Sequence, residues 1–165
     1  MLDFLNIVQP VDEENYSYAM KTQVEPYLAK RRRDGHFISA DGKKLHYEAH
    51  LIENPKGNIV LSHGFTESAE KFREMAYYFT GNGFNTFALD HRGHGYSYRM
   101  AGDKETVRLG KFSDYIEDLN VFVNDVVAPL SKGLPMHIFG HSMGGGIAAR
   151  YIQVYPDVFE KAILS

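Results

Sequence analysis

Residues Met136–Gly146 read MHIFGHSMGGG, a short apolar run that leads into a turn of the type Gly-x-Ser-x-Gly. Apolar residues at helical spacing follow this turn as far as about Tyr155. The order therefore predicts a strand, a sharp turn and a helix. In such a turn the serine lies in a strained bend and its hydroxyl is pushed out of the sheet. We take Ser142 as the candidate nucleophile.

The glycines around Ser142 fit this geometry. Gly140 and Gly144 flank the serine, where a Cβ would collide with a neighbouring strand or helix. Gly145 and Gly146 are expected to let the following helix lie close to the sheet. The N-terminus of that helix directs N–H groups at any negative charge that forms beside the serine.

Composition and charge exclude several classes of function. The chain has 165 residues, enough for one domain with a hydrophobic core, and a net charge of −3, so no nucleic-acid partner is expected. The absence of cysteine excludes a disulfide framework and a cysteine-ligated zinc site. No apolar run approaches the roughly 18 residues of a membrane span, and the first residues lack signal-peptide features. We expect a cytoplasmic protein, with peripheral contact at the inner membrane surface left open.

Residues 1–34 are interpreted as an N-terminal extension that is partly helical, and residues 35–165 as part of one α/β domain. Apolar spacing predicts a helix over 15–33 that the basic run Lys30–Arg33 closes. Four cations fit either transient contact with an anionic membrane surface or a solvated helix end whose charges suit the helix dipole. We favour the helix end, because so few charges do not anchor a protein alone.

Strand and helix patterns alternate strictly beyond the extension. A hairpin is expected over 35–51, with its turn at Asp41-Gly42. The strands predicted after it are 58–62, 84–89, 134–139 and 161–165, and the helices are 68–79, 112–130 and 143–155. Such alternation predicts the α/β class, with a mostly parallel sheet and helices on both faces.

Three unusual segments fall where predicted strands end. His63-Gly64-Phe65 follows one strand, the run Asp90–Ser97 follows the next, and Ser142 follows a third. Ligands of parallel sheets bind beyond the carboxyl ends of the strands. The three segments are therefore expected to meet at one site.

Together these motifs resemble the α/β-hydrolase fold. They are the pair HG at 63–64, the run DHRGHGYS at 90–97 and the pentapeptide GHSMG at 140–144. Within that fold the chain is most similar to the lysophospholipase and monoacylglycerol lipase group, over about residues 35–165. The resemblance implies hydrolysis of carboxylic esters of monoacyl lipids through an acyl-enzyme on Ser142. It implies a small lipid ester as substrate and no cofactor or metal.

The resemblance also assigns the surrounding residues. The backbone N–H of Met143 and that of Phe65 are implied to be the two donors that stabilise the oxyanion. The supporting residues are His63, Gly64, Gly140, His141 and Gly144. Among them, His63 is expected to shape the oxyanion segment through hydrogen bonds.

No histidine of this sequence is a good candidate for the general base. His141 adjoins Ser142 and must point away from it, His94 and Asp90 are expected to be structural, and His137 is expected to be a satisfied histidine in or near the core. His36, His46 and His50 belong to the hairpin, expected to lie far from Ser142.

In the fold that the chain resembles, the acid, the histidine and a lid follow later strands. The chain matches that fold only up to about its sixth strand. We therefore expect the remainder of the hydrolase domain C-terminal to residue 165. We also expect residues 1–165 alone to be marginally stable, aggregation-prone and nearly inactive, since a serine hydroxyl without a base is a poor nucleophile.

Other functions remain alternatives. A carboxylesterase, a thioesterase and an acyltransferase of the same fold use the same serine chemistry. A non-catalytic module that retains the fold is the alternative from a different class.

Overall fold

Within the described residues, six strands form one sheet in the order β1-β2-β4-β3-β5-β6. The computed structural model describes residues 8, 10–101, 103, 106–108 and 110–165. The neighbours β4, β3, β5 and β6 pair in parallel, whereas β1 and β2 pair antiparallel with each other and β2 pairs antiparallel with β4. The strands are β1 (Arg32–Ile38), β2 (Lys44–His50), β3 (Gly57–Ser62), β4 (Phe84–Leu89), β5 (Met136–Gly140) and β6 (Lys161–Leu164).

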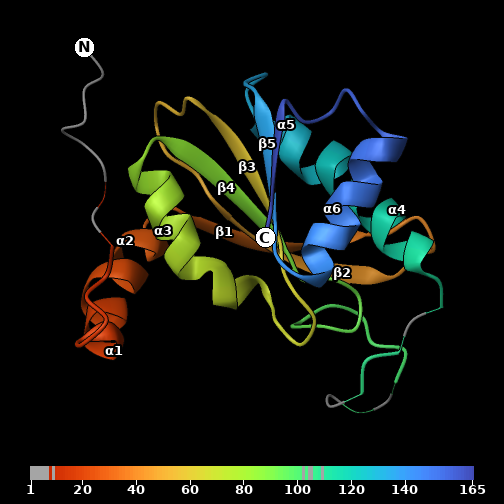
Figure 1. The fold of residues 1–165 in the computed structure, drawn as a ribbon, viewed down its shortest axis with the longest axis horizontal. Helices are drawn as coiled ribbons and strands as arrows, with labels where there is room; N and C mark the ends of the chain where they lie inside the picture. Colours follow the sequence, from red (N-terminus) through yellow and green to blue (C-terminus); the bar gives the residue numbers. More distant parts are fainter. Residues whose placement is uncertain (1–7, 9, 102, 104–105, 109) are drawn as a thin grey trace.

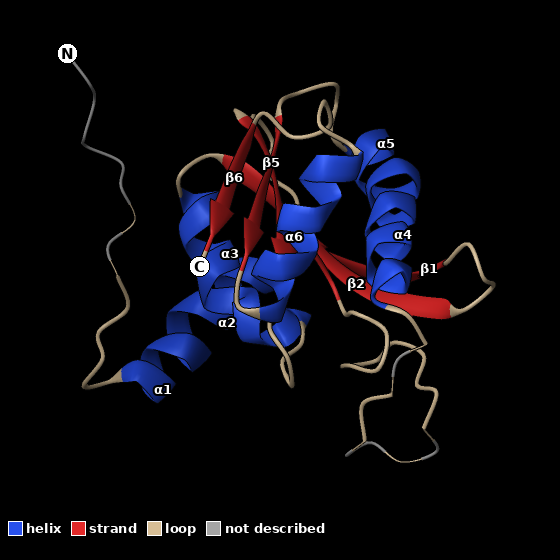
Figure 2. Cartoon of the chain, turned by 45° about the vertical axis from the view of Figure 1, so that its right-hand side comes forward, coloured by secondary structure: helices blue, strands red, loops and turns tan. Residues whose placement is uncertain are grey.

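Helices cover both faces of this sheet (Figures 1 and 2). On one side lie α1 (Tyr16–Ala19), α2 (Glu25–Ala29) and α3 (Arg73–Gly81). On the other lie α4 (Phe112–Phe122), α5 (Ala128–Leu130) and α6 (Met143–Val154). The chain passes through a π-helical turn at Met20–Val24, a 3₁₀ turn at Ala69–Phe72 and a second π-helical turn at Val123–Val127. The predicted α/β architecture is confirmed.

Side-chain alternation along β3 divides the core into two layers. Val60 belongs to the cluster that packs under α4 and α6, whereas Ile59 and Leu61 belong to the cluster under α3 and the extension. Every residue of β3 is buried. A strand that is apolar on both faces is typical of the middle of a covered sheet, and it brings its carboxyl end to the centre of the molecule.

The N-terminal extension packs on the sheet and does not end where the sequence predicted. Helical structure stops at Ala29 and β1 begins at Arg32, so the expected helix over 15–33 is too long. Strand pairing overrides the helical pattern here, because Arg32 lies opposite His50 of β2. The interpretation of Lys30–Arg33 as a helix end is therefore wrong for Arg32 and Arg33, which belong to β1. Arg31, which precedes them, lies 3.7 Å over the Tyr27 ring.

Two hydrogen bonds and an ion pair tie the extension to α3. The Tyr16 hydroxyl donates to Glu74 at 2.9 Å, and the Val11 N–H donates to the hydroxyl of Tyr78 at 2.8 Å. Arg73 lies 3.3 Å from Glu25. The apolar side chains buried beneath these contacts include Val11, Ala19, Val24 and Leu28. None of the helices in the described part of the chain is long and apolar enough to cross a bilayer.

A buried ion pair joins the loop after β4 to α4. The Arg92 guanidinium donates twice to Asp118, at 2.6 Å in each case, and lies 3.1 Å from Asp41. Burial raises the pKa of Asp118, although Arg92 opposes this rise. Because Asp118 is fully buried, the two charges depend on each other for their stability.

Removing one partner of this pair is expected to destabilise the fold. Asp118→Ala leaves Arg92 short of its buried counter-charge and should lower the free energy of unfolding by about 3–5 kcal/mol. Urea denaturation of the two proteins measures this difference. The control is Asp125→Ala, an exposed carboxylate one helical segment further on, which should change stability by under about 0.5 kcal/mol. Equal effects of the two substitutions would contradict a structural role for the pair.

Candidate active site

Ser142 lies at the junction of β5 and α6 in a strained backbone conformation. Its φ is 52° and its ψ is −118°, a region that side chains other than glycine rarely adopt. The residue is exposed. Two hydrogen bonds hold the bend: the Ser142 N–H donates to Ser165 O at 2.7 Å, and the His141 N–H donates to Ser62 O at 3.0 Å. The predicted sharp turn is thus present, with the serine at its apex.

The glycines permit a close approach that side chains would block. A Cβ on Gly140 would lie 2.6 Å from Gly144 O, and one on Gly144 would overlap Ser62 O. A Cβ on Gly145 would lie 3.2 Å from Gly140 O. These three positions behave as predicted, but Gly146 does not, because nothing lies within 4 Å of the point that a Cβ would occupy there. Gly146 faces away from the sheet, so its expected role in close packing is wrong.

The segment after β3 lies directly against the serine. A Cβ on Gly64 would be 3.3 Å from the Cβ of Ser142 and 2.9 Å from Glu67 Oε2. The Gly64 N–H donates to that same carboxylate oxygen at 2.7 Å. The motifs at 63–65 and 140–144, distant in the sequence, are therefore neighbours in space.

His63 fixes the orientation of the next peptide. Its Nδ1 lies 2.8 Å from Gly64 O, and its Nε2 accepts the N–H of His91 at 3.0 Å. The ring must therefore carry its proton on Nδ1 and donate to Gly64 O. The N–H of Phe65 belongs to the same planar trans peptide as Gly64 O, so it points the opposite way, off the side that His63 occupies.

Two backbone donors beside the serine are unused. Neither the Phe65 N–H nor the Met143 N–H donates to a protein acceptor within the described residues. Met143 is the first residue of α6, where the N–H groups have no partner within the helix. Donors of this kind, fixed before a reaction begins, stabilise an oxygen that becomes negative.

Buried neutral histidines form a layer beneath this site. The His63 ring lies 4.6 Å from that of His91 and 5.1 Å from that of His94, centroid to centroid. Burial lowers the pKa of His63 to about 4, that of His50 in β2 to about 4, and that of His91 well below its ordinary value. These imidazoles are therefore uncharged at neutral pH. A charge would weaken the tautomer-specific bonds of His63.

Asp90 anchors the loop after β4. It accepts hydrogen bonds from His46 Nδ1 at 2.8 Å, from the Ala69 N–H at 2.7 Å and from the Tyr96 N–H at 2.9 Å. Burial opposes ionisation, yet these donors lower the pKa of Asp90. The expected structural role of Asp90 is confirmed. Its partner His46 comes from the hairpin, a contact that sequence spacing did not reveal.

The remaining histidines differ in whether their ring nitrogens are hydrogen-bonded. His91 Nε2 lies 2.9 Å from Ser62 Oγ, and His94 Nδ1 lies 3.1 Å from Arg92 O. His137 was expected to be satisfied, but its buried Nδ1 has no hydrogen-bond partner among the described residues, and the side chain is half-buried. Within that same part of the chain, no histidine forms a hydrogen bond with Ser142, and no cluster of His, Asp and Glu suits a metal ion.

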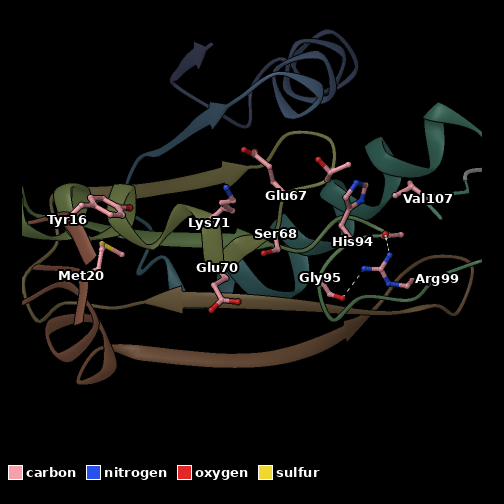
Figure 3. A pocket seen from close by; sticks show the side chains of 12 residues that line it. Tyr16, Met20, Glu67, Ser68, Glu70, Lys71, His94, Gly95, Arg99 and Val107 are labelled. Atoms are coloured by element: carbon pink, nitrogen blue, oxygen red, sulfur yellow. Dashed lines mark hydrogen bonds between the residues drawn. The ribbon is translucent and has the colours of Figure 1, made fainter. Parts of the chain in front are cut away.

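A pocket of about 680 Å³ opens next to the segment after β3. Figure 3 shows Tyr16 and Met20 at one end, His94, Gly95 and Arg99 at the other, and charged residues between them. Glu67, which binds Gly64, lines this pocket. Glu67 thus links the pocket wall to Gly64, whereas Ser142 is not among the residues that line the pocket.

A family model described as serine aminopeptidase S33 matches residues 53–165. The chain belongs to this α/β-hydrolase family. Monoacylglycerol lipase from Mycolicibacterium smegmatis is 34% identical over 139 residues, 84% of this chain and 48% of that protein. Lysophospholipase L2 from Escherichia coli is 29% identical over 136 residues, 82% of this chain and 40% of that protein. A carboxyl esterase structure from Bacillus coagulans superposes with a TM-score of 0.71 at 26% identity, covering 80% of this chain and 43% of that one.

The S33 match confirms the resemblance drawn from the three motifs. The chain spans about half or less of the length of the curated relatives that it matches. The matched residues include β3, β4, β5, β6 and the turn at Ser142, but they leave out the N-terminal extension, β1 and β2. The matched part thus contains all three motifs.

Two glycines of the turn should respond in opposite ways to alanine. Gly144→Ala forces a Cβ into the backbone of Ser62 and should destabilise the protein by about 2 kcal/mol or more. Gly146→Ala meets open space within α6 and should stabilise it by about 0.5–1 kcal/mol, because alanine loses less entropy in a helix. Thermal and urea unfolding of both variants measure the signs. Destabilisation by both would contradict the assigned difference.

Acid should destabilise the protein through its buried histidines. His50 and His63 have folded pKa values of about 4 against an ordinary value of 6.5, so the unfolded chain binds more protons between these values. Stability is then complete above about pH 6.5 and falls as the pH drops towards 4, by up to about 1.4 kcal/mol per pH unit for each histidine.

Urea unfolding between pH 7 and pH 4.5 tests this slope. His50→Gln should remove one histidine's share of it. A stability that does not change across this range would overturn the expectation.

Proposed function

We propose that this chain carries the nucleophile and the oxyanion donors of a serine ester hydrolase. The observation that supports it most strongly is the exposed Ser142 at positive φ, with Gly64 packed against its Cβ. Strain of this kind persists only where the surrounding structure enforces it, and it concentrates at functional sites.

The proposed reaction begins with attack of Ser142 Oγ on an ester carbonyl carbon. The carbonyl oxygen becomes negative and accepts hydrogen bonds from the N–H groups of Phe65 and Met143. Collapse of this intermediate expels the alcohol and leaves an acyl group on the serine, which water then removes. Each oxyanion donor contributes about 3 kcal/mol to lowering the barrier in enzymes of this kind.

The general base and its acid partner are proposed to lie outside residues 1–165. The reason is that no histidine of the described residues forms a hydrogen bond with Ser142, and His63 in particular has both ring nitrogens bonded to other groups. The match covers 48% of one relative and 40% of the other. Residues 1–165 alone are then expected to hydrolyse esters poorly, because the serine lacks a group to take its proton.

Esters of monoacyl lipids are the proposed substrates. Relatives named monoacylglycerol lipase and lysophospholipase L2 support this class. A structure titled carboxyl esterase favours short-chain esters as the alternative. The dependence of turnover on acyl length, measured on the complete protein, separates the two classes.

Removal of the Ser142 hydroxyl tests the proposal. In the complete protein, Ser142→Ala should lower kcat for ester hydrolysis by roughly 10⁵–10⁶-fold, because the covalent step is lost. It should also abolish labelling by a fluorophosphonate. The control is Ser17→Ala, an exposed serine of α1, which should leave both readouts as they are. Labelling or turnover that survives Ser142→Ala would refute the proposed nucleophile.

A further inference from the structure

The turn after β3 contains Phe65, a proposed oxyanion donor, in a strained backbone. The Glu67 N–H donates to Gly64 O at 3.3 Å, which closes a four-residue turn. Thr66, the third residue of this turn, has a φ of 62°. Turns with a positive φ at this position favour glycine or asparagine there, and a β-branched residue is strained in this region. A strained backbone of this kind persists only where the surrounding structure enforces it.

The side chain of Glu67 supplies one such contact. Glu67 is half-buried on the turn after β3 (Figure 3). Its Oε2 accepts the Gly64 N–H at 2.7 Å, so the carboxylate of the last residue of the turn binds the backbone of the first. Hydrogen bonds to a charged acceptor are stronger than those between neutral groups. The carboxylate therefore fixes the beginning of the turn.

His63 holds the same glycine through its carbonyl group. The His63 Nδ1 donates to Gly64 O at 2.8 Å, while the Gly64 N–H is bound by Glu67. Gly64 O and the Phe65 N–H belong to one planar peptide group. The direction of the Phe65 N–H therefore depends on how both backbone groups of Gly64 are held.

Gly64 lies between Glu67 and the serine. A Cβ on Gly64 would lie 2.9 Å from Glu67 Oε2 and 3.3 Å from the Cβ of Ser142. A carboxylate cannot stabilise an oxyanion directly, because like charges repel. An effect of Glu67 that favours the reaction must therefore act through the backbone of Gly64.

We propose that Glu67 is a positioning residue for the oxyanion site: by binding the Gly64 N–H, its carboxylate holds the Phe65 N–H where the oxygen of the reacting ester becomes negative. The inference rests on the proposed ester hydrolysis at Ser142 and adds a residue to it. A misplacement of about 1 Å costs enzymes on the order of 100-fold in rate, so the hydrogen bond that fixes Gly64 has a measurable effect on turnover.

Three substitutions of Glu67 separate its hydrogen bond from its charge. Glu67→Gln keeps an acceptor oxygen at the same reach without the charge. Glu67→Asp keeps the charge on a side chain that is shorter by one methylene group, and Glu67→Ala removes both. The readout is hydrolysis of p-nitrophenyl acetate by the complete protein, because this ester offers no hydroxyl or cationic group that a carboxylate binds directly.

Glu67→Ala and Glu67→Asp should lower kcat and kcat/KM together by about 10–100-fold, because a donor used in the transition state is displaced. KM should change by less than about two-fold, since binding of the ground state does not use this donor. Glu67→Gln should stay within about three-fold of the unsubstituted protein, because the Gly64 N–H keeps its acceptor. Labelling by a fluorophosphonate, whose phosphoryl oxygen uses the same donors, should slow in the same order.

The matched control is Glu53→Ala, which removes an exposed carboxylate from the segment after β2. This variant should keep the kcat and the KM of the unsubstituted protein. Urea unfolding of each Glu67 variant shows whether it is folded. Where Glu67→Ala fails to fold, the comparison of Glu67→Asp with Glu67→Gln decides the question by itself.

Each contrary result has its own meaning. An unchanged kcat in Glu67→Ala and Glu67→Asp, while hydrolysis is lost in Ser142→Ala, overturns the positioning role and leaves the proposed function standing. A loss in Glu67→Gln as large as that in Glu67→Ala assigns the effect to the charge and overturns the role of the hydrogen bond, as does a loss confined to KM. Hydrolysis that does not depend on Ser142 overturns the proposed function and this inference with it.

Discussion

The close approach of α6 to β3 is the constraint on which the rest of the site depends. Gly144 lies against the backbone of Ser62 with no room for a Cβ, and Gly140 lies against Gly144 in turn. Because α6 lies so close to β3, the turn between β5 and α6 is short. The chain makes it through one residue at positive φ, Ser142. The exposure of Ser142, its contact with Gly64 and the free N–H of Met143 all follow from this proximity.

A layer of uncharged imidazoles supports the other half of the site. His63 bonds to Gly64 O on one side and to the His91 N–H on the other, so it links the segment after β3 to the loop after β4. Its burial keeps it neutral, and only the neutral ring can both donate and accept in this way. The orientation of the Phe65 peptide is thus tied to the protonation of a residue that never touches the proposed substrate.

The sequence predicted the local elements of this structure better than the contacts between segments that are distant in the sequence. The elbow could be predicted because glycine spacing and apolar periodicity both act over a few residues. The start of β1 at Arg32 could not, because strand pairing with distant His50 overrides a helical pattern. His46 looked like an ordinary hairpin residue, and only the antiparallel pairing of β2 with β4 brings it to Asp90. Gly146 looked identical to its neighbours, since a run of glycines does not tell which one faces the sheet.

The hydrogen bond from the Ser142 N–H to Ser165 O joins the turn after β5 to the end of β6. The contacts of the β1–β2 hairpin join residues that are close in the sequence, whereas those that hold the turn at Ser142 depend on the pairing of β5 with both β3 and β6. Contacts of this second kind are non-local and are slow to form in folding. The backbone conformation of the proposed nucleophile is thus set by the pairing of distant strands and not by the residues of its own turn alone.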